Sequence, residues 1–171
     1  MARPAIESFL AEGGYKPVFS DSPILREKKG AFVTLEAGGT LRGCIGYLND
    51  DERLDVTVQK MAIKAATEDP RFPPVRQKEL PEIEIEISVL SPFRQIHEVS
   101  EIQAGEHGLL IEKGMNRGLL LPQVASREGW DRETFLSHAC LKAGLPPAAW
   151  REAGIKIFIF SCDLFSEGES R

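Results

Sequence analysis

The sequence predicts an α+β protein with a mostly antiparallel β-sheet flanked by helices. Two observations favour this fold class. Two pairs of apolar segments each flank a glycine-containing loop, as in β-hairpins, and the predicted helices fall between strands irregularly rather than in strict alternation. At 171 residues the chain is long enough for one compact domain or for two small ones in contact.

Two amphipathic helices are predicted in the first half of the chain. The first opens the chain and carries its apolar residues on one face: Ile6, Phe9 and Leu10. The glycines at 13–14 end it. The second spans residues 53–69, where apolar residues recur at helical spacing: Leu54, Val58, Met61, Ala62, Ala65 and Ala66. Pro70 ends this pattern, and the proline-rich connector 71–75 must be extended or turned because a proline disfavours helix in the residue before it.

A hairpin and a strand are also predicted in this half. Segments 32–35 and 41–47 flank a Gly-Gly loop, which predicts a hairpin with Cys44 on its second strand or at the exit. Residues 82–89 alternate between aliphatic side chains and glutamate or serine. We expect one face of this strand to pack and the other to meet water.

The second half repeats these patterns. Apolar segments 109–111 and 119–121 predict a second hairpin, which Pro122 closes. Asp131 is placed to cap a helix whose apolar face carries Phe135, Leu136, Ala139, Cys140 and Ala143. Segment 155–160 is apolar on both faces apart from one lysine, which predicts a strand in the middle of the sheet.

Composition and charge disfavour several classes of protein. With 42% hydrophobic and 27% charged residues, the chain resembles globular rather than disordered proteins. The net charge of −5 disfavours a dedicated nucleic-acid-binding protein, which normally carries a basic face. We expect a cytoplasmic protein without membrane association, because the sequence has neither a signal-peptide pattern nor an apolar stretch as long as a bilayer span.

The cysteine spacing and the absence of several short motifs disfavour particular kinds of site in this chain. The three cysteines, at 44, 140 and 162, form no Cys-x-x-Cys pair, so we expect reduced thiols and neither a disulfide framework nor a zinc site. No histidine has a ligand-like spacing to a second one, and we assign no metal ligand. The sequence also lacks a Walker loop, a dinucleotide fingerprint, His-Glu-x-x-His and Gly-x-Ser-x-Gly.

The hexapeptide Leu41–Gly46 holds the first candidate site residues. Gly43 and Gly46 interrupt a strand pattern, and such glycines often mark a bulge or a close approach of the backbone to a ligand. We assign both glycines, and Arg42, to substrate binding. Cys44 is a candidate catalytic nucleophile if Arg42 or a histidine lowers the pKa of its thiol. The alternative is a tightly packed hairpin in which Cys44 is a small buried hydrophobic residue.

Four further residues complete the candidate site. Asp69 is a candidate base or ligand, and Arg71 a clamp for carboxylate or phosphate. Alternatively, these two side chains pair with each other or cap backbone groups. His107, in a turn before a strand, is the best acid/base candidate among the histidines, or else a structural hydrogen-bonding group. Gln123 is assigned to substrate binding.

The hexapeptide Leu-Arg-Gly-Cys-Ile-Gly is followed by further motif blocks, in order, at 65–75, 87–92, 105–111, 118–125, 130–131 and 140–145. In this combination of motifs the chain resembles the AMMECR1 (AMMECR-one) domain family. The resemblance implies a compact α+β fold of two intimately packed sub-domains with the hexapeptide at a cleft, and no particular reaction. We treat residues 1–171 as one such domain with a possible seam near 69–80.

The resemblance also implies partners. Bacterial members accompany a Memo-like protein and a radical-SAM enzyme, as protein A of the AmmeMemoRadiSam system, which suggests a redox or modification pathway. Three functions remain open. The first is an enzyme or enzyme subunit that binds a small anionic molecule in a cleft at the hexapeptide. The second is a non-catalytic protein-interaction module, and the third is nucleic-acid recognition.

Overall fold

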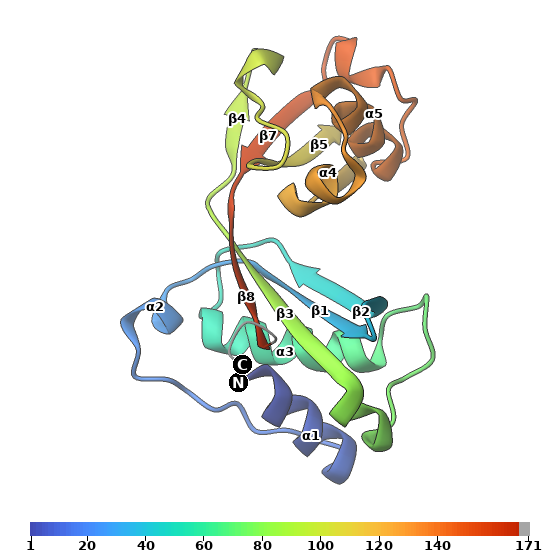
Figure 1. Ribbon diagram of the computed structural model, residues 1–171. Coiled ribbons are helices and arrows are strands. Elements are labelled where there is room, and N and C mark those ends of the chain that lie inside the picture. Colours follow the sequence, from blue (N-terminus) through green and yellow to red (C-terminus); the bar gives the residue numbers. More distant parts are fainter. Residues whose placement is uncertain (168–171) are drawn as a thin grey trace. The chain divides into compact units, whose positions relative to one another are not determined.

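The computed structural model describes residues 1–167, which form two units (Figure 1). The first unit contains Met1–Leu90 and the chain from Asp163 onward, and the second contains Ser91–Cys162. The chain therefore enters the second unit once and leaves it once. The second unit is an insertion into the first.

Residues 69–80, where the sequence placed a possible seam, lie inside the first unit. Val75 is buried in the core of that unit, and its N–H donates to the Ala66 carbonyl at 2.7 Å. The prolines of this connector therefore shape a segment that folds back onto its own unit. The two units as described divide between Leu90 and Ser91 and between Cys162 and Asp163.

The first unit contains a four-stranded sheet in the order β2-β1-β3-β8. Its strands are β1 (Ala31–Ala37), β2 (Thr40–Tyr47), β3 (Ile83–Leu90) and β8 (Cys162–Ser166). Strand β1 pairs antiparallel with both β2 and β3. The predicted first hairpin is confirmed, and its turn is formed by Gly38 and Gly39, whose φ angles of 56° and 74° favour glycine.

Helix α3 (Leu54–Thr67) covers one face of this sheet and confirms the helix predicted over 53–69. Its apolar stripe packs on the sheet, as the spacing predicted. The opposite side of α3 is also buried, because α1 (Ala2–Glu12) and residues 14–22 lie against it. Three polar residues of α3 are therefore in the interior: Asp55, Thr57 and Gln59.

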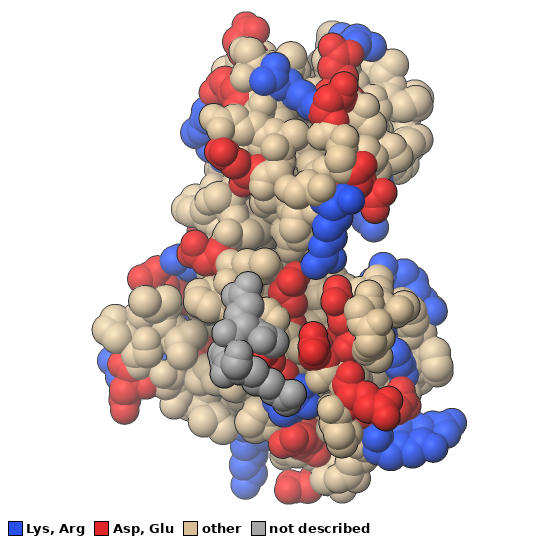
Figure 2. Space-filling model, in the orientation of Figure 1, with Lys and Arg blue, Asp and Glu red and all other residues tan. Residues whose placement is uncertain are grey.

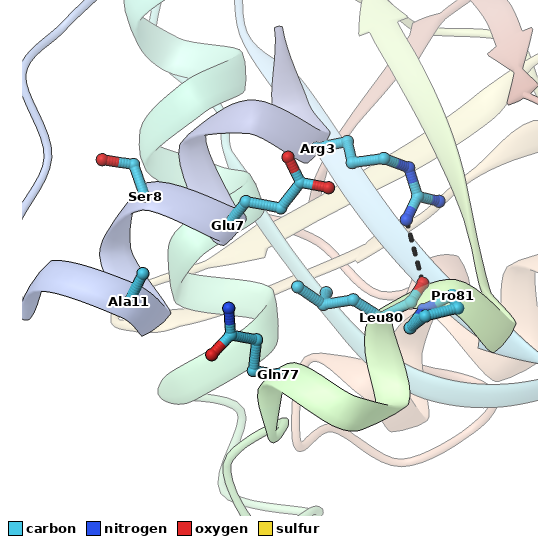
Figure 3. Close-up of a pocket in the computed structure, with 7 residues that line it drawn as sticks. All are labelled: Arg3, Glu7, Ser8, Ala11, Gln77, Leu80 and Pro81. Carbon is cyan, nitrogen blue, oxygen red and sulfur yellow. Dashed lines mark hydrogen bonds between the residues drawn. The ribbon is translucent and has the colours of Figure 1, made fainter.

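Two short helices complete the first unit, α2 (Pro23–Arg26) and the 3₁₀ helix η1 (Gln77–Glu82). The guanidinium of Arg3 on α1 donates to the Leu80 carbonyl at 2.9 Å (Figure 3) and to the Ile83 carbonyl at 2.6 Å. These bonds join the first helix to the segment that leads into β3.

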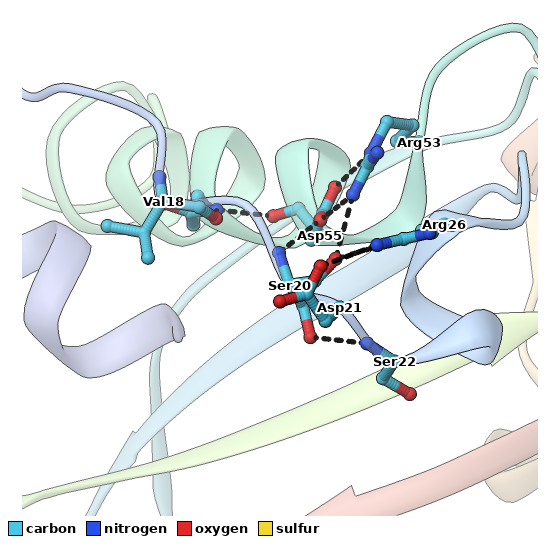
Figure 4. Close-up of polar contacts among 8 residues, drawn as sticks. Val18, Ser20, Asp21, Ser22, Arg26, Arg53 and Asp55 are labelled. Carbon is cyan, nitrogen blue, oxygen red and sulfur yellow. Dashed lines mark hydrogen bonds and ion pairs between the residues drawn. The ribbon is translucent and has the colours of Figure 1, made fainter.

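Buried polar groups of α3 also hold the segment between α1 and α2 (Figure 4). The Gln59 amide accepts from the Val18 N–H at 2.9 Å and donates to the Val18 carbonyl at 2.8 Å. Asp55 accepts from the Ser20 N–H at 2.9 Å and from two Arg53 nitrogens at 3.0 and 2.6 Å. Residues 14–22, which show no periodic pattern, are thus fixed by side chains of a helix.

The second unit has its own antiparallel sheet, in the order β4-β7-β5-β6. Its strands are β4 (Arg94–Ile96), β5 (Gly108–Lys113), β6 (Asn116–Leu120) and β7 (Lys156–Phe160). The predicted second hairpin is confirmed as β5–β6, and the apolar segment 155–160 forms the interior strand β7 as predicted. The sequence led us to expect one sheet, whereas residues 1–167 form two.

The helices of the second unit are α4 (Pro122–Glu128), α5 (Arg132–Lys142) and the 3₁₀ helices η2 (Val99–Glu101) and η3 (Ala149–Arg151). The predicted cap of α5 is confirmed, because Asp131 Oδ1 accepts from the Thr134 N–H at 2.8 Å. Pro122 does more than close the hairpin. It begins α4, where its fixed φ and missing N–H suit the first helical turn.

Each unit has its own hydrophobic core, and the two cores share no residue. The first lies between α3 and the sheet of its unit, and the second between α5 and β5–β7. This arrangement, helices packed on antiparallel sheets, is the predicted α+β class. Over residues 1–167, no helix is both long enough and apolar enough to span a bilayer.

Candidate functional site

The hexapeptide Leu41–Gly46 lies on β2, an edge strand of the first sheet. Gly43 lies against α3, and Ile45 packs on the core beneath that helix. Because side chains alternate along a strand, Cys44 and Gly46 lie on the other face. The Cys44 thiol is therefore on the side of the sheet that α3 does not cover.

Both glycines of the hexapeptide are required by packing. A Cβ atom at Gly43 would lie 2.2 Å from the Ala65 carbonyl oxygen on α3. One at Gly46 would lie 2.2 Å from the ring of Phe32 on β1. The sequence predicted a bulge or a close approach of the backbone, and the structure shows which groups approach: a helix carbonyl and an aromatic ring of the same unit.

Asp69 and Arg71, just beyond the end of α3, hold the backbone of Cys44. The Cys44 N–H donates to Asp69 Oδ2 at 2.8 Å, and Arg71 Nη2 donates to the Cys44 carbonyl at 3.4 Å. The two side chains also form a two-point ion pair, with Arg71 Nε 3.0 Å from Oδ1 and Nη2 2.7 Å from Oδ2. The pair therefore takes the place of a neighbouring strand at the outer edge of β2.

This ion pair is asymmetric in exposure. Only 2% of the Asp69 side chain is exposed, compared with 51% of the Arg71 side chain. The Arg71 guanidinium, with the N–H groups of Cys44 and Arg71, holds the pKa of the Asp69 carboxyl far below its usual range. Over residues 1–167, Arg71 Nη1 has no hydrogen-bond partner. One donor group of a fixed guanidinium is thus left for a ligand.

The Cys44 thiol is half-buried, and burial raises its pKa above that of an ordinary cysteine. Thr34 Oγ1 donates to Cys44 Sγ at 3.3 Å, and this bond and the Arg71 charge lower the pKa, but by less than burial raises it. The thiol is consequently protonated at neutral pH. The nucleophile hypothesis called for a lowered pKa, and the residues around Cys44 produce the opposite shift.

Two rows of side chains cross this face of the sheet. The register places Cys44, Thr34 and Glu86 in one row on β2, β1 and β3. The next row contains Gly46, Phe32 and Ser88. Thr34 and Ser88 are buried and Glu86 is half-buried, so the face of β3 that was expected to meet water does so only in part.

The Arg42 guanidinium is hydrogen-bonded to other residues of the first unit. Its Nε and Nη2 donate to Glu79 Oε2 at 3.1 and 3.0 Å, and its Nη1 donates to the Pro73 carbonyl at 2.9 Å. Glu79 also accepts from the N–H of Arg76, the residue that caps η1. Arg42 therefore joins β2 to the connector after α3, and a ligand at its guanidinium competes with these contacts.

The other two candidate residues belong to the second unit. His107 precedes β5, and its Nδ1 accepts from the Gln103 N–H at 3.1 Å, which is the structural role weighed against catalysis. Gln123 lies in the first turn of α4. The first unit thus brings together Arg42, Cys44, Asp69 and Arg71 with the two glycines, whereas His107 and Gln123 are placed by a separate sheet and helix.

Sequence reasoning did not select Thr34 as a partner of Cys44. Counting outward from the Gly38-Gly39 turn pairs Thr34 with Gly43, one residue short of the partner seen in the structure. An irregularity after Leu35 shifts the register and places Thr34 opposite Cys44. Without that bulge the hydroxyl would not reach the thiol.

No metal centre is apparent at this site. Over residues 1–167, no group of three or more histidine, cysteine, aspartate or glutamate side chains is arranged to hold a metal ion. What the arrangement offers instead is a protonated thiol, a hydroxyl and a carboxylate on the sheet face, with a fixed guanidinium at its edge.

Fold and site together define a class of α+β protein. A small α+β unit is inserted between β3 and β8, which are neighbours in a four-stranded sheet, and a glycine-flanked cysteine lies on the edge strand β2. The chain belongs to the AMMECR1 family, whose model matches residues 1–165.

Similar proteins occur in archaea. Protein Mbar_A1807 of Methanosarcina barkeri is 45% identical over 99% of this chain and 88% of its own length. Protein MJ0810 of Methanocaldococcus jannaschii is also 45% identical, over 99% of this chain and 88% of its own. The crystal structure of protein PH0010 from Pyrococcus horikoshii, 42% identical, matches 97% of this chain and 87% of that one with a TM-score of 0.93.

Proposed function

We propose that the chain is an enzyme or enzyme subunit that binds a small anionic molecule at the edge of the sheet beside Cys44. The observation that carries this proposal is the Arg71 guanidinium, which is oriented by a buried carboxylate while half of its side chain is exposed. A guanidinium held in place loses little conformational freedom on binding, and its planar donors match carboxylate or phosphate.

Within this proposal the Cys44 sulfur is a protonated thiol, and not a thiolate, before the reaction begins. Its raised pKa means that a base, on the protein or on the ligand, must remove the proton before the sulfur reacts. Thr34 stabilises the sulfur anion once it forms, because its hydroxyl already donates to Sγ. The roles of His107 as acid/base and Gln123 as a ligand contact remain predictions.

Anion binding is tested by titrating the full chain with inorganic phosphate and following backbone amide shifts by NMR. We expect the amides of Cys44 and Arg71 to shift, and Arg71→Gln to weaken binding by about tenfold. Arg26→Gln is the matched control, because that side chain is 53% exposed and paired with the carboxylate of Asp21. Equal affinity of the two variants for phosphate would contradict the proposal.

The thiol is tested by the pH dependence of iodoacetamide alkylation, read at each cysteine by mass spectrometry. We expect Cys44 to react more slowly at pH 7 than cysteine in an unfolded peptide, with a midpoint displaced to higher pH. Thr34→Val should displace the midpoint further, and Thr34→Ser should restore it. A Cys44 that outpaces the peptide at neutral pH contradicts the raised pKa.

The alternative function is docking of a Memo-like or radical-SAM protein on the hexapeptide. The Asp69–Arg71 pair already occupies the backbone groups of Cys44 at the edge of β2, which disfavours docking by strand addition. Pull-down with those two proteins separates the functions. Binding that survives Cys44→Ser but is lost in Arg42→Ala would favour docking.

Nucleic-acid recognition has weaker support than either. On the face shown in Figure 2, acidic and basic side chains are interspersed rather than gathered into a basic surface. RNA binding that is absent, or that does not weaken as salt is raised, would remove this possibility.

A further inference from the structure

The Phe32 side chain on β1 lies on the same face of the first sheet as the Cys44 thiol, the face that α3 does not cover. Val33 and Leu35 point to the other face of β1 and are fully buried in the first core. Phe32, in contrast, is half-buried, and over residues 1–167 it belongs to neither hydrophobic core. A large apolar ring therefore lies at the surface of the sheet, beside the site proposed for an anion.

The Phe32 ring lies flat over the backbone of Gly46 on β2. A Cβ atom at Gly46 would be 2.4, 2.2 and 2.3 Å from the ring atoms Cγ, Cδ1 and Cε1. A point that is nearly equidistant from three consecutive ring atoms lies over the face of the ring and not beyond its edge. One face of the ring therefore covers a glycine of the neighbouring strand, a pairing that supports a sheet, and the other face points away from the sheet.

The outer face of this ring has no stacking partner. In the described part of the chain, neither an aromatic ring nor a cationic side chain stacks on Phe32. Aromatic rings attract one another in offset stacks, in addition to the free energy gained by burying apolar surface. The half-buried ring is consequently a platform on which a planar group of a ligand can lie.

This platform and the anion site lie along the same strand. Arg71 Nη2 donates to the Cys44 carbonyl at 3.4 Å, and Gly46, beneath the Phe32 ring, is the second residue after Cys44. Because a strand rises about 3.4 Å per residue, the guanidinium and the ring are separated along β2 by roughly 7 Å. An anionic group at Arg71 and a ring on Phe32 can therefore belong to one small molecule, and the Cys44 thiol lies beside the atoms that join them.

We propose that the ligand of this site is an arylalkyl carboxylate, whose ring stacks on Phe32 while its carboxylate binds Arg71. The inference rests on the proposed anion site and adds the chemical class of the molecule that binds there. A chain of two methylene groups, as in 3-phenylpropionate, suits the separation between guanidinium and ring. Aliphatic carboxylates and inorganic phosphate contact the guanidinium alone, so they bind more weakly.

The test is an NMR titration of the full chain with 3-phenylpropionate, propionate and 3-phenylpropan-1-ol. We expect 3-phenylpropionate to bind about five- to tenfold more tightly than propionate, because it adds the stacking and burial of a ring. The alcohol keeps the ring but lacks the charge, and we expect it to bind at least about fivefold more weakly than 3-phenylpropionate. Nuclear Overhauser contacts between the ligand ring and the Phe32 ring protons report the stack directly.

Three variants isolate the contribution of the ring. Phe32→Leu should bring the affinity for 3-phenylpropionate within about twofold of that for propionate, and leave the affinity for propionate unchanged. Phe32→Tyr, which keeps an aromatic ring, should keep the preference, so that loss of the stack is distinguished from loss of structure. Phe165→Leu is the matched control and should also keep it, because Phe165 is a 55% exposed ring on β8, at the opposite edge of the same sheet.

Equal affinity of the unmodified chain for 3-phenylpropionate and propionate overturns the inference, and so does a preference that survives Phe32→Leu. In either case, propionate binding that is weakened by Arg71→Gln still supports the anion site. If Arg71→Gln changes the affinity for neither carboxylate, the anion site is contradicted, and the arylalkyl ligand with it.

Discussion

Gly43 illustrates how much a single missing side chain determines at this site. Its lack of a Cβ atom lets β2 approach the Ala65 carbonyl on α3, and the alternation of side chains along the strand places the next residue, Cys44, on the opposite face. Gly46 does the same for the ring of Phe32. The two glycines of the hexapeptide are thus explained by packing, whereas Arg71 Nη1 has no hydrogen-bond partner within residues 1–167.

Replacing Gly43 by alanine should lower the free energy of unfolding by about 2–3 kcal/mol, because the new methyl group overlaps a helix carbonyl that cannot move freely. Urea denaturation measures the change. Gly14→Ala is the control, since a Cβ atom there meets open space, and it should be nearly neutral. Equal stability of the two variants would show that β2 can move away from α3 at little cost.

Asp69 makes stability depend on pH in the acid range. Its pKa is lower in the folded protein than the value of about 3.9 in an unfolded chain. The stabilisation it contributes is therefore complete above the unfolded value and is lost as pH falls towards the folded one.

Replacing Asp69 by asparagine should lower the free energy of unfolding at pH 7 by about 1–3 kcal/mol and reduce its further loss between pH 5 and pH 2. Urea denaturation across this pH range provides the measurement. Asp50→Asn, which changes an exposed loop carboxylate, should keep the acid dependence of the unmodified chain. An unchanged profile in Asp69→Asn would assign the acid loss to other carboxylates.

At the scale of elements, α3 organises the first unit because it is buried on nearly all sides. The buried polar residues of such a helix are mostly hydrogen-bonded, because an unpaired polar group costs free energy away from water. Gln59 and Asp55 find their partners in the backbone of residues 18–20 (Figure 4). A segment without regular secondary structure is thereby fixed across a helix.

Replacing Gln59 by leucine should free this segment while preserving the helix. The Val18 N–H and the Val18 carbonyl each lose their hydrogen bond to the Gln59 amide. We therefore expect faster hydrogen exchange at Val18 and a loss of about 1–3 kcal/mol in unfolding free energy. Lys64→Ala, on the exposed side of the same helix, should change neither by much, because its ion pair with Glu68 is solvated. Unaltered exchange at Val18 would mean that other contacts hold the segment.

At the scale of the whole molecule, the second unit is a continuous insertion with its own sheet and core. Its two ends are joined by hydrogen bonds, since the Ser91 N–H donates to the Ser161 carbonyl and the Ser161 N–H donates to Ser91 Oγ, both at 2.9 Å. A segment whose ends meet and whose core is complete has the features of an independent folding unit.

A fragment of residues 91–162 should therefore fold alone. We expect antiparallel-sheet and helix signals by circular dichroism and one cooperative thermal transition. The fragment 1–90, which lacks the edge strand β8, is the comparison. Its thermal transition should lie at a lower temperature than that of fragment 91–162. A fragment 91–162 without a cooperative transition would show that its core depends on the rest of the chain.

Elements with strong local patterns were predictable. The periodic helices α1, α3 and α5 and both hairpins follow from residues close together in the sequence, because spacing, caps and glycine turns act locally. The four-residue helix α2, the three-residue strand β4 and the strand β8 escaped prediction. A short strand is stabilised by the partner it pairs with. The partner of β8 is β3, and the whole inserted unit separates these two strands in the sequence.

In the candidate site, too, the features that depend on local sequence were predictable and those that depend on distant contacts were not. The sequence by itself determined the family, the α+β class and the hexapeptide on a strand, since these depend on motif order and local spacing. Only the tertiary structure decided that the chain has two sheets, that Asp69 and Arg71 hold the backbone of Cys44, and that a bulge brings Thr34 to its thiol. Those outcomes depend on contacts between distant residues and on burial, which sets the pKa of the thiol and is a property of the packed fold.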